Sequence, residues 1–139
     1  MANTGFDWGA WAFAQDDGST DWDADALADN ATETSAVAID LDGKAACEVG
    51  ITLAEDNTGA IDGVVTVYVL GDASTQFEEV GIGSPWAFTI TPEQNDTVVK
   101  RFMVSPASYG TFKVAVKNEC GQELAVSVKY RTADIPVAS

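Results

Sequence analysis

Carboxylates are the side chains of this sequence whose number and spacing come nearest to a chemical site. The chain holds 22 acidic residues and no histidine. Asp21, Asp23 and Asp25 alternate as the first ligands of a calcium-binding loop do. Ala26, however, stands where that loop needs glycine, and Thr32 stands where it needs the closing glutamate. We therefore interpret the run as surface acids and predict no metal site.

The adjacent acids Glu78 and Glu79 are the other pair that a hydrolase could use. Such pairs are common in a chain this acidic, and the sequence around them predicts no aromatic-lined cleft. The absence of histidine removes the commonest general base and the usual serine and cysteine triads. We predict no catalytic residue, no enzymatic activity and no cofactor.

The two cysteines, Cys47 and Cys120, have a spacing that matches no zinc or redox motif. The N-terminus lacks the basic and apolar regions of a signal peptide, and no stretch has the apolar length of a membrane span. Synthesis in the cytoplasm is expected. Two free thiols are then the preferred interpretation, with a disulfide as the alternative.

Charge is divided unevenly along the chain, whose net charge is −15. Residues 1–34 carry eight acids and no base, whereas six of the seven bases lie at or after Lys100. The overall charge would repel nucleic acid and anionic membranes, so we expect neither as a partner. The separation predicts that one end of the chain contacts the other, within a subunit or between subunits.

Alternation of apolar and polar residues begins near residue 35 and predicts strands. The expected strands span residues 35–41, 46–54, 64–70, 86–90, 97–104, 112–117 and 124–130. About seven short strands without an amphipathic helix predict an antiparallel β-sandwich over residues 35–133, either Ig-like or jelly-roll. Residues 134–139 are expected to form a short tail, which Pro136 keeps out of any helix.

The last two expected strands suit a hairpin. Pairing Lys117 with Glu123 keeps all apolar residues on one face and sets opposite charges across the strands. In this hairpin Lys113, Lys129 and Arg131 share the outward face.

Residues 1–34 fall outside the strand pattern and carry bulky aromatic residues, which is unusual for a disordered tail. We interpret them as an acidic N-terminal arm that docks on a neighbouring copy or another surface. Its expected anchors are Phe6, Trp8, Trp11 and Phe13. Lys113, Lys129 and Arg131 are the expected electrostatic receiver. A chain lacking residues 2–34 is then expected to stay folded but to lose its partner.

Residues 101–118 (RFMVSPASYGTFKVAVKN) and 121–130 (GQELAVSVKY), with the upstream segment 62–70 (DGVVTVYVL), resemble small virion-associated proteins of tailed bacteriophages. Such proteins include capsid decoration (cement) proteins and tail accessory modules. The resemblance implies a β-rich, non-enzymatic structural protein of the virion, made in the host cytoplasm. It implies the major capsid protein or another virion protein as partner, and a homo-oligomer, with a trimer favoured.

The alternative hypothesis is a carbohydrate- or receptor-binding β-sandwich module of a phage tail or adhesin. Trp86 and Tyr109 would then provide its sugar-binding surface. A structural role competes with this one, because Trp86, Phe88 and Ile90 alternate as core residues do.

Overall fold

The computed structural model describes residues 7–55, 59–72, 77–80 and 86–134, and these form strands and turns without any helix. One sheet, here the first sheet, has the order β1-β11-β6-β9, and β2 and β3 also pair with β11. Its strands are β1 (Asp7–Trp8), β2 (Ala12–Phe13), β3 (Asp25–Leu27), β6 (Ala46–Ala54), β9 (Thr97–Val104) and β11 (Leu124–Asp134). No helix in this described part is long or apolar enough to cross a membrane.

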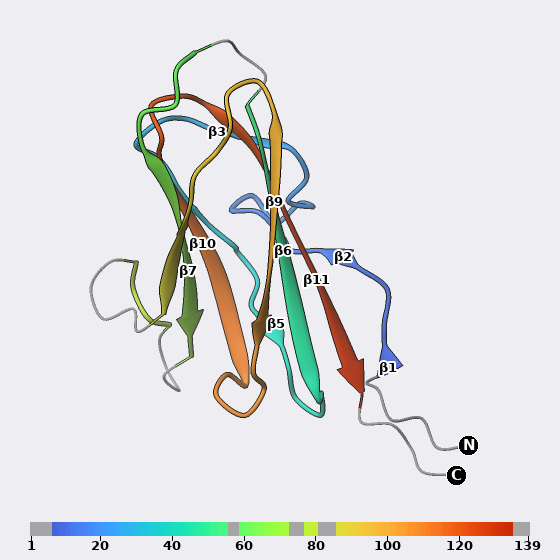
Figure 1. Cartoon of the computed structure of the whole chain (residues 1–139). Helices are drawn as coiled ribbons and strands as arrows, with labels where there is room; N and C mark the ends of the chain where they lie inside the picture. The colour runs from blue at the N-terminus through green and yellow to red at the C-terminus, as the bar shows by residue number, and fades with distance from the viewer. Residues whose placement is uncertain (1–6, 56–58, 73–76, 81–85, 135–139) are drawn as a thin grey trace.

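The second sheet has the order β4-β10-β7-β8, and β5 also pairs with β10. It consists of β4 (Thr32–Thr34), β5 (Ile39–Asp40), β7 (Val64–Gly71), β8 (Ala87–Ile90) and β10 (Thr111–Glu119). All pairs in both sheets are antiparallel. The two sheets lie face to face (Figure 1), so the predicted antiparallel β-sandwich is confirmed.

The core lies between the sheets because the long strands alternate as the sequence predicts. On β6, the side chains of Cys47, Val49, Ile51 and Leu53 are buried, and those between them are half-buried. Alternate residues of β7, β10 and β11 are buried in the same way. Side chains of successive strand residues point to opposite faces, so one face of each strand enters the core and the other faces outward.

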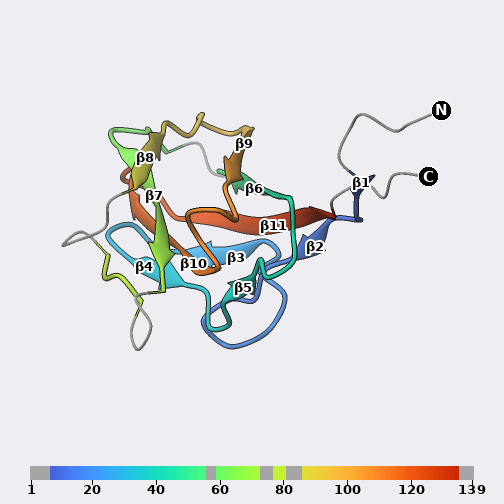
Figure 2. The same cartoon turned by 90° about the horizontal axis from the view of Figure 1, so that it is seen from below.

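The N-terminal segment does not form an arm separate from the sandwich over its described part, residues 7–34. Its strands β1, β2 and β3 pair in turn along β11, and β4 then pairs with β10 in the second sheet. Trp22 is wholly buried in the core. Figure 2, which shows the molecule from below, places β2 to β5 together on one side of the sandwich. The boundary predicted at residue 34 therefore falls inside the folded domain. Residues 7–34 are part of that domain and cover one side of it.

Asn118 fixes this segment in place. Its Nδ2 donates hydrogen bonds to the carbonyl oxygens of Leu27 (3.0 Å) and Gln122 (2.7 Å). Its backbone N donates to the carbonyl oxygen of Ala31 at 2.9 Å, and its own carbonyl oxygen accepts a bond from Asn30 N at 2.7 Å. Asn118 is wholly buried, so each lost bond would leave a polar group without water.

The predicted final hairpin is wrong. β10 pairs with β4, β5 and β7 in the second sheet, and β11 belongs to the first sheet. Residues 120–123 thus carry the chain from one sheet to the other, and the apolar faces of β10 and β11 meet across the core. Lys113 consequently lies on the opposite outer face of the sandwich from Lys129 and Arg131.

The side of the sandwich opposite the N-terminal segment is bordered by β8 and β9 (Figure 2). Phe88 of β8 and Phe102 of β9 meet edge to face, with ring centres 4.8 Å apart. The Trp86 ring centre lies 5.4 Å from that of Phe102. These rings are half-buried and pack against the core, which supports the structural role considered for Trp86.

Candidate functional site

Aromatic side chains of the N-terminal strands lie on basic side chains of β11. Lys129 Nζ lies 4.6 Å from the ring centre of Phe13, its partner in the β2–β11 register. Arg131 Cζ lies 4.4 Å from the ring centre of Trp8 and 4.9 Å from that of Trp11. Cation–π contacts of this kind contribute about 0.5–1 kcal/mol each at exposed positions. Three expected anchors and two expected receivers therefore meet within one subunit.

Glu48 of β6 balances the charge of these bases. Its Oε1 accepts a hydrogen bond from Arg131 Nε at 2.9 Å and forms an ion pair with Arg131 Nη2 at 2.8 Å. Arg101 Nε, on the neighbouring strand β9, lies 4.0 Å from Glu48 Oε2. Because β6 lies between β11 and β9, one carboxylate serves an arginine on each side.

Gly50 provides the space in which Trp11 lies. A Cβ atom built on Gly50 would be 3.6 Å from Cζ3 of Trp11, so the indole covers the backbone in the middle of the sheet. Trp11 remains 38% exposed, and the neighbouring apolar residues Val99 and Met103 are 61% and 50% exposed. We call this surface the aromatic–cation face and define it as Trp8, Trp11, Phe13, Glu48, Val99, Arg101, Met103, Lys129 and Arg131.

Among the described residues, one predicted site residue lies elsewhere. Lys113 projects from the second sheet, and its Nζ lies 4.8 Å from the ring centre of Phe77. Phe6 lies outside the described residues. Each ion pair that the structure gives among the described residues takes its acid from Glu48, Glu119 or Asp134, so the acids of residues 7–34 form none of them. Besides the pairing of β1, β2 and β3 with β11, the two ends of the chain meet through aromatic rings that lie on basic side chains rather than through ion pairs.

A second feature is a carboxyl cluster formed by Asp16, Asp25 of β3 and Glu33 of β4. One oxygen from each group lies within 4.8 Å of the others. Asp16 Oδ1 accepts hydrogen bonds from the backbone N atoms of Gly18 (2.8 Å) and Thr20 (3.0 Å). Asp16 Oδ2 accepts one from Thr20 Oγ1 at 2.7 Å. The cluster joins the two sheets, because β3 pairs with β11 and β4 pairs with β10.

The three carboxyl groups have different pKa values. A hydrogen bond with Asp25, followed by those from Thr20, lowers the pKa of Asp16 to about 2. Burial, followed by the hydrogen bond to Asp16 and the Asp16 charge, raises the pKa of Asp25 to about 6. Burial, followed by the charges of nearby acids, raises the pKa of Glu33 to about 7. The cluster therefore retains protons well above the usual range of carboxylic acids.

The carboxyl cluster bears on the calcium interpretation weighed for residues 21–25. Asp21 and Asp23 are exposed, while Asp25 lies beside Asp16 and Glu33. The three acids of that run therefore do not point toward one common metal position, as the ligands of a calcium-binding loop do. Three carboxylate oxygens at this spacing are ligands that a hard divalent cation accepts. The same oxygens also share hydrogen bonds among themselves, which is an alternative way to relieve their repulsion.

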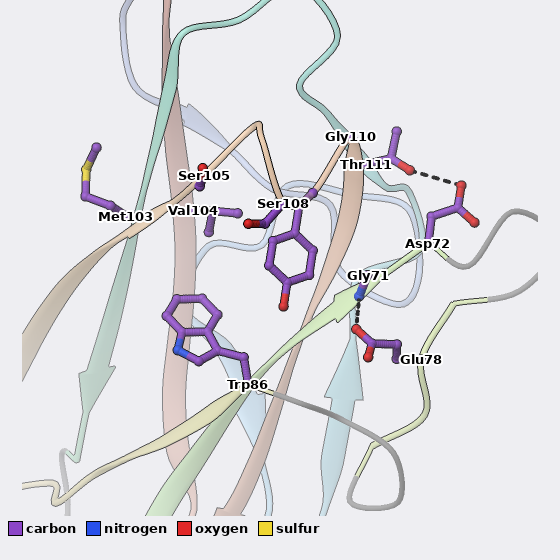
Figure 3. Close-up of a pocket in the computed structure, with 11 residues that line it drawn as sticks. Gly71, Asp72, Glu78, Trp86, Met103, Val104, Ser105, Ser108, Gly110 and Thr111 are labelled. Carbon is purple, nitrogen blue, oxygen red and sulfur yellow. Dashed lines mark hydrogen bonds between the residues drawn. The ribbon is translucent and has the colours of Figure 1, made fainter.

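The third feature is a cleft of about 650 Å³ at the end of the sandwich where the chain leaves β9 (Figure 3). Trp86 and Tyr109, the pair named for sugar binding, both line it. Polar side chains complete the wall: Asp72, Glu78, Ser105, Ser108 and Thr111. A second hollow of about 590 Å³ continues the cleft and shares Asp72, Gly110 and Thr111 with it.

Gly71 sets the geometry of the cleft wall. Its backbone N donates a hydrogen bond to Glu78 Oε1 at 2.7 Å (Figure 3). A Cβ atom on Gly71 would lie 2.8 Å from Tyr109 Cε1 and 2.9 Å from Glu78 Oε1, so only glycine allows both side chains this close. Burial and the Glu78 charge raise the pKa of Tyr109, which keeps its hydroxyl protonated as a hydrogen-bond donor.

The cysteines are not nucleophiles in this fold. Cys47 and Cys120 are wholly buried and unpaired, which confirms the prediction of free thiols. Burial raises the pKa of Cys47 to about 12 and also raises that of Cys120. A thiol reacts through its thiolate, so both are unreactive in the folded protein.

Sequence reasoning missed residues that only the tertiary structure brings together. Glu33 joins Asp16 and Asp25 because β3 and β4 belong to different sheets, and no local spacing encodes that. Gly71 and Glu78 lie beside Tyr109 although they are far from it in the sequence. One signal in the sequence pointed to the aromatic–cation face. Val99 and Met103 are apolar but share the outward side of a predicted strand with Arg101, and both are exposed in the structure. No protein-family model matches the chain, and no curated protein matches it either.

Proposed function

We propose that this protein is a non-enzymatic structural component of a virion, a capsid decoration protein that binds the phage head through the aromatic–cation face. The observation that carries the proposal is the composition of that face. Arginine, methionine and aromatic residues are the types enriched in protein interfaces and at their energetic hot spots. Here these types lie together on the outer side of the first sheet, with Trp11, Val99 and Met103 open to solvent.

Charge supports the same surface. Arg101 projects from β9, and Lys129 and Arg131 project from β11, the two strands that flank β6, in a protein whose net charge is −15. Only Glu48 offsets them in the ion pairs of this face. A basic surface on an otherwise acidic protein selects an acidic partner surface and orients the molecule toward it. The partner we propose is the major capsid protein, presenting carboxylates and an apolar patch to solvent.

Multiplicity would make such binding effective. A head offers many identical sites, so moderate contacts suffice when they are repeated. The resemblance to small virion-associated proteins favours a trimer, which would engage several sites at once. The side chains of this face come from strands that are fixed by the sandwich, so little ordering cost accompanies binding.

The test begins with particles purified from the virus whose genome encodes the chain. We expect the protein to co-sediment with intact heads in a fixed ratio to the major capsid protein. Heads lacking it should take up added protein, and the double variant Arg101→Glu, Met103→Asp should bind at least about tenfold more weakly. Arg101 is 63% exposed and Met103 50% exposed, so these changes should leave the fold intact.

Lys117→Glu is the matched control, because it reverses a charge on the outer face of the second sheet. It should bind as the unaltered chain does. The proposal fails if the protein is absent from purified particles. It also fails if the double variant occupies heads as fully as the control.

A further inference from the structure

The cleft has an aromatic wall that is held in place. Trp86 packs against Phe88 and Phe102, with ring centres 6.0 Å and 5.4 Å away. Tyr109 packs edge to face against the buried Phe112 at 6.5 Å. Both cleft aromatics are half-buried, so each has one side packed and another directed to the cavity that it lines. Rigid aromatic surfaces offer contact area at a small entropic cost.

Hydrogen-bonding groups surround this wall. Glu78 Oε1 accepts the bond from Gly71 N, and Asp72 Oδ2 accepts one from Thr111 Oγ1 at 3.3 Å. Each carboxylate has a second oxygen and further lone pairs, so both keep acceptor capacity after fixing their own segments. The Tyr109 hydroxyl and the serine hydroxyls can both donate and accept. The cleft thus pairs apolar rings with polar groups suited to a ligand rich in hydroxyls.

Charge narrows the ligand class. Among the described residues that line the cleft, two are acidic and none is basic. Lys44 lies in the adjoining hollow, but its Nζ forms an ion pair with Asp134 at 3.0 Å. Phosphate, sulfate and sialic acid would therefore meet uncompensated negative charge. A neutral polyol meets no such repulsion, and its hydroxyls can form charge-assisted bonds with the carboxylates.

We propose that this cleft binds a neutral saccharide, which stacks a sugar ring between Trp86 and Tyr109 and donates hydroxyl hydrogen bonds to Asp72 and Glu78. The volume of about 650 Å³ lies in the range of small-molecule sites. The adjoining hollow of about 590 Å³ extends the cleft and gives room for a second sugar unit. This activity goes beyond shell binding, because the cleft and the aromatic–cation face share only Met103.

The experiment uses the full chain on a panel of immobilised neutral, sialylated and phosphorylated oligosaccharides, followed by calorimetric titration with the best neutral one. We expect binding to neutral glycans alone. Glu78→Gln should weaken it roughly tenfold, because an amide oxygen is a weaker acceptor than a carboxylate. Gln can still accept the bond from Gly71 N, so this variant should fold, and an unchanged melting temperature will verify that.

Trp86→Phe tests whether the tryptophan emission change that saccharide binding causes comes from Trp86, independently of the affinity for the saccharide. It retains an aromatic ring in the packed group, so calorimetric binding should fall by only a few-fold, while the saccharide-induced change in tryptophan emission should disappear. Trp11→Ala is the matched control, since it removes a tryptophan from the outer face and should change neither the affinity nor the emission response. The inference is overturned if no neutral glycan binds or only charged glycans bind. It is equally overturned if a folded Glu78→Gln protein binds with unaltered affinity.

A negative result in the saccharide test does not contradict the proposal of head binding. A negative result in the head-binding test does not contradict the proposal of saccharide binding. The double variant of the head-binding test includes Met103, which lines both surfaces, so Arg101→Glu alone is the variant that alters the face without altering a residue that lines the cleft. Glu78→Gln does the reverse. The two proposals are therefore judged separately.

Discussion

Arg131 and Trp8 come from opposite ends of the chain and stack with the guanidinium carbon 4.4 Å from the ring centre. The division of charge along the sequence predicts contact between the ends, and this pair is such a contact. It differs from the expected one in kind, because the N-terminal segment supplies a ring and Glu48 supplies the carboxylate. An arginine satisfies both at once, since its planar group stacks by its face and donates hydrogen bonds from its edge.

Arg131→Ala should lower the free energy of unfolding by about 2–3 kcal/mol, because it removes two cation–π contacts and leaves the half-buried Glu48 without its closest donor. Urea unfolding followed by circular dichroism measures this. Arg101→Ala, at 4.0 Å from the same carboxylate and largely exposed, should cost less than about 0.5 kcal/mol. Equal losses in the two variants would contradict the role given to Arg131.

The N-terminal segment should be essential for folding. The sequence predicts that a chain lacking residues 2–34 stays folded, but the structure shows that this deletion removes β1 to β4 and the buried Trp22. We now expect the truncated chain to be unfolded or aggregated, with a circular dichroism spectrum that lacks the sheet signal. A truncated chain that melts cooperatively would show instead that β5 to β11 suffice.

A single substitution makes the same point without shortening the chain. Trp22→Ala should destabilise the fold by about 3–5 kcal/mol, as removal of a wholly buried aromatic side chain does. Trp22→Phe should cost less, since the indole Nε1 has no hydrogen-bond partner among the described residues and none is lost. Trp11→Ala is the control on the surface. Urea midpoints that fall equally for Trp22→Ala and Trp11→Ala would rule out a core role for Trp22.

Local alternation predicted the long strands of the sandwich because each of them buries one face. Of the expected strand 35–41, only Ile39–Asp40 forms a strand, β5. The expected segments 46–54 and 97–104 coincide with β6 and β9. Alternation cannot say which sheet a strand joins. β10 and β11 have the apolar pattern of a hairpin, and the same pattern also suits two strands that face each other across the core. The short N-terminal strands were missed because two or three residues show no period, although Trp22 and Leu27 are buried.

Stability should depend on pH through the carboxyl cluster. The pKa of Glu33 is raised to about 7 and that of Asp25 to about 6, so the folded state holds protons that the unfolded chain releases near pH 4. Stability from this source is therefore present below about pH 4 and is lost as the pH rises to 7. The pKa of Asp16, lowered to about 2, acts oppositely, and its contribution is lost as the pH falls from 4 toward 2.

Glu33→Gln mimics the protonated side chain, so it should flatten the decline in melting temperature between pH 4.5 and 7.5. At pH 7.5 the variant should melt a few degrees above the unaltered chain. Asp23→Asn removes the same charge at an exposed position of the same segment and controls for general repulsion in this acidic protein. Parallel melting profiles for all three proteins would show that the carboxyl cluster does not set the pH response.

Substitutions of Gly50 test whether the position of Trp11 over the sheet matters. Gly50→Ala adds one carbon atom beside the indole, and Gly50→Val adds three. Alanine adds a Cβ at 3.6 Å from the indole, an ordinary contact, and removes the entropic cost of a glycine in a strand. Gly50→Ala should therefore keep or raise stability by up to about 0.5 kcal/mol. The two methyl groups of Gly50→Val reach further into the space of the ring, so Trp11 must lift away from Arg131. Its emission should then shift to longer wavelength, and head binding should weaken although the core is unchanged. If Gly50→Val leaves both signals unaltered, the position of Trp11 does not govern the aromatic–cation face.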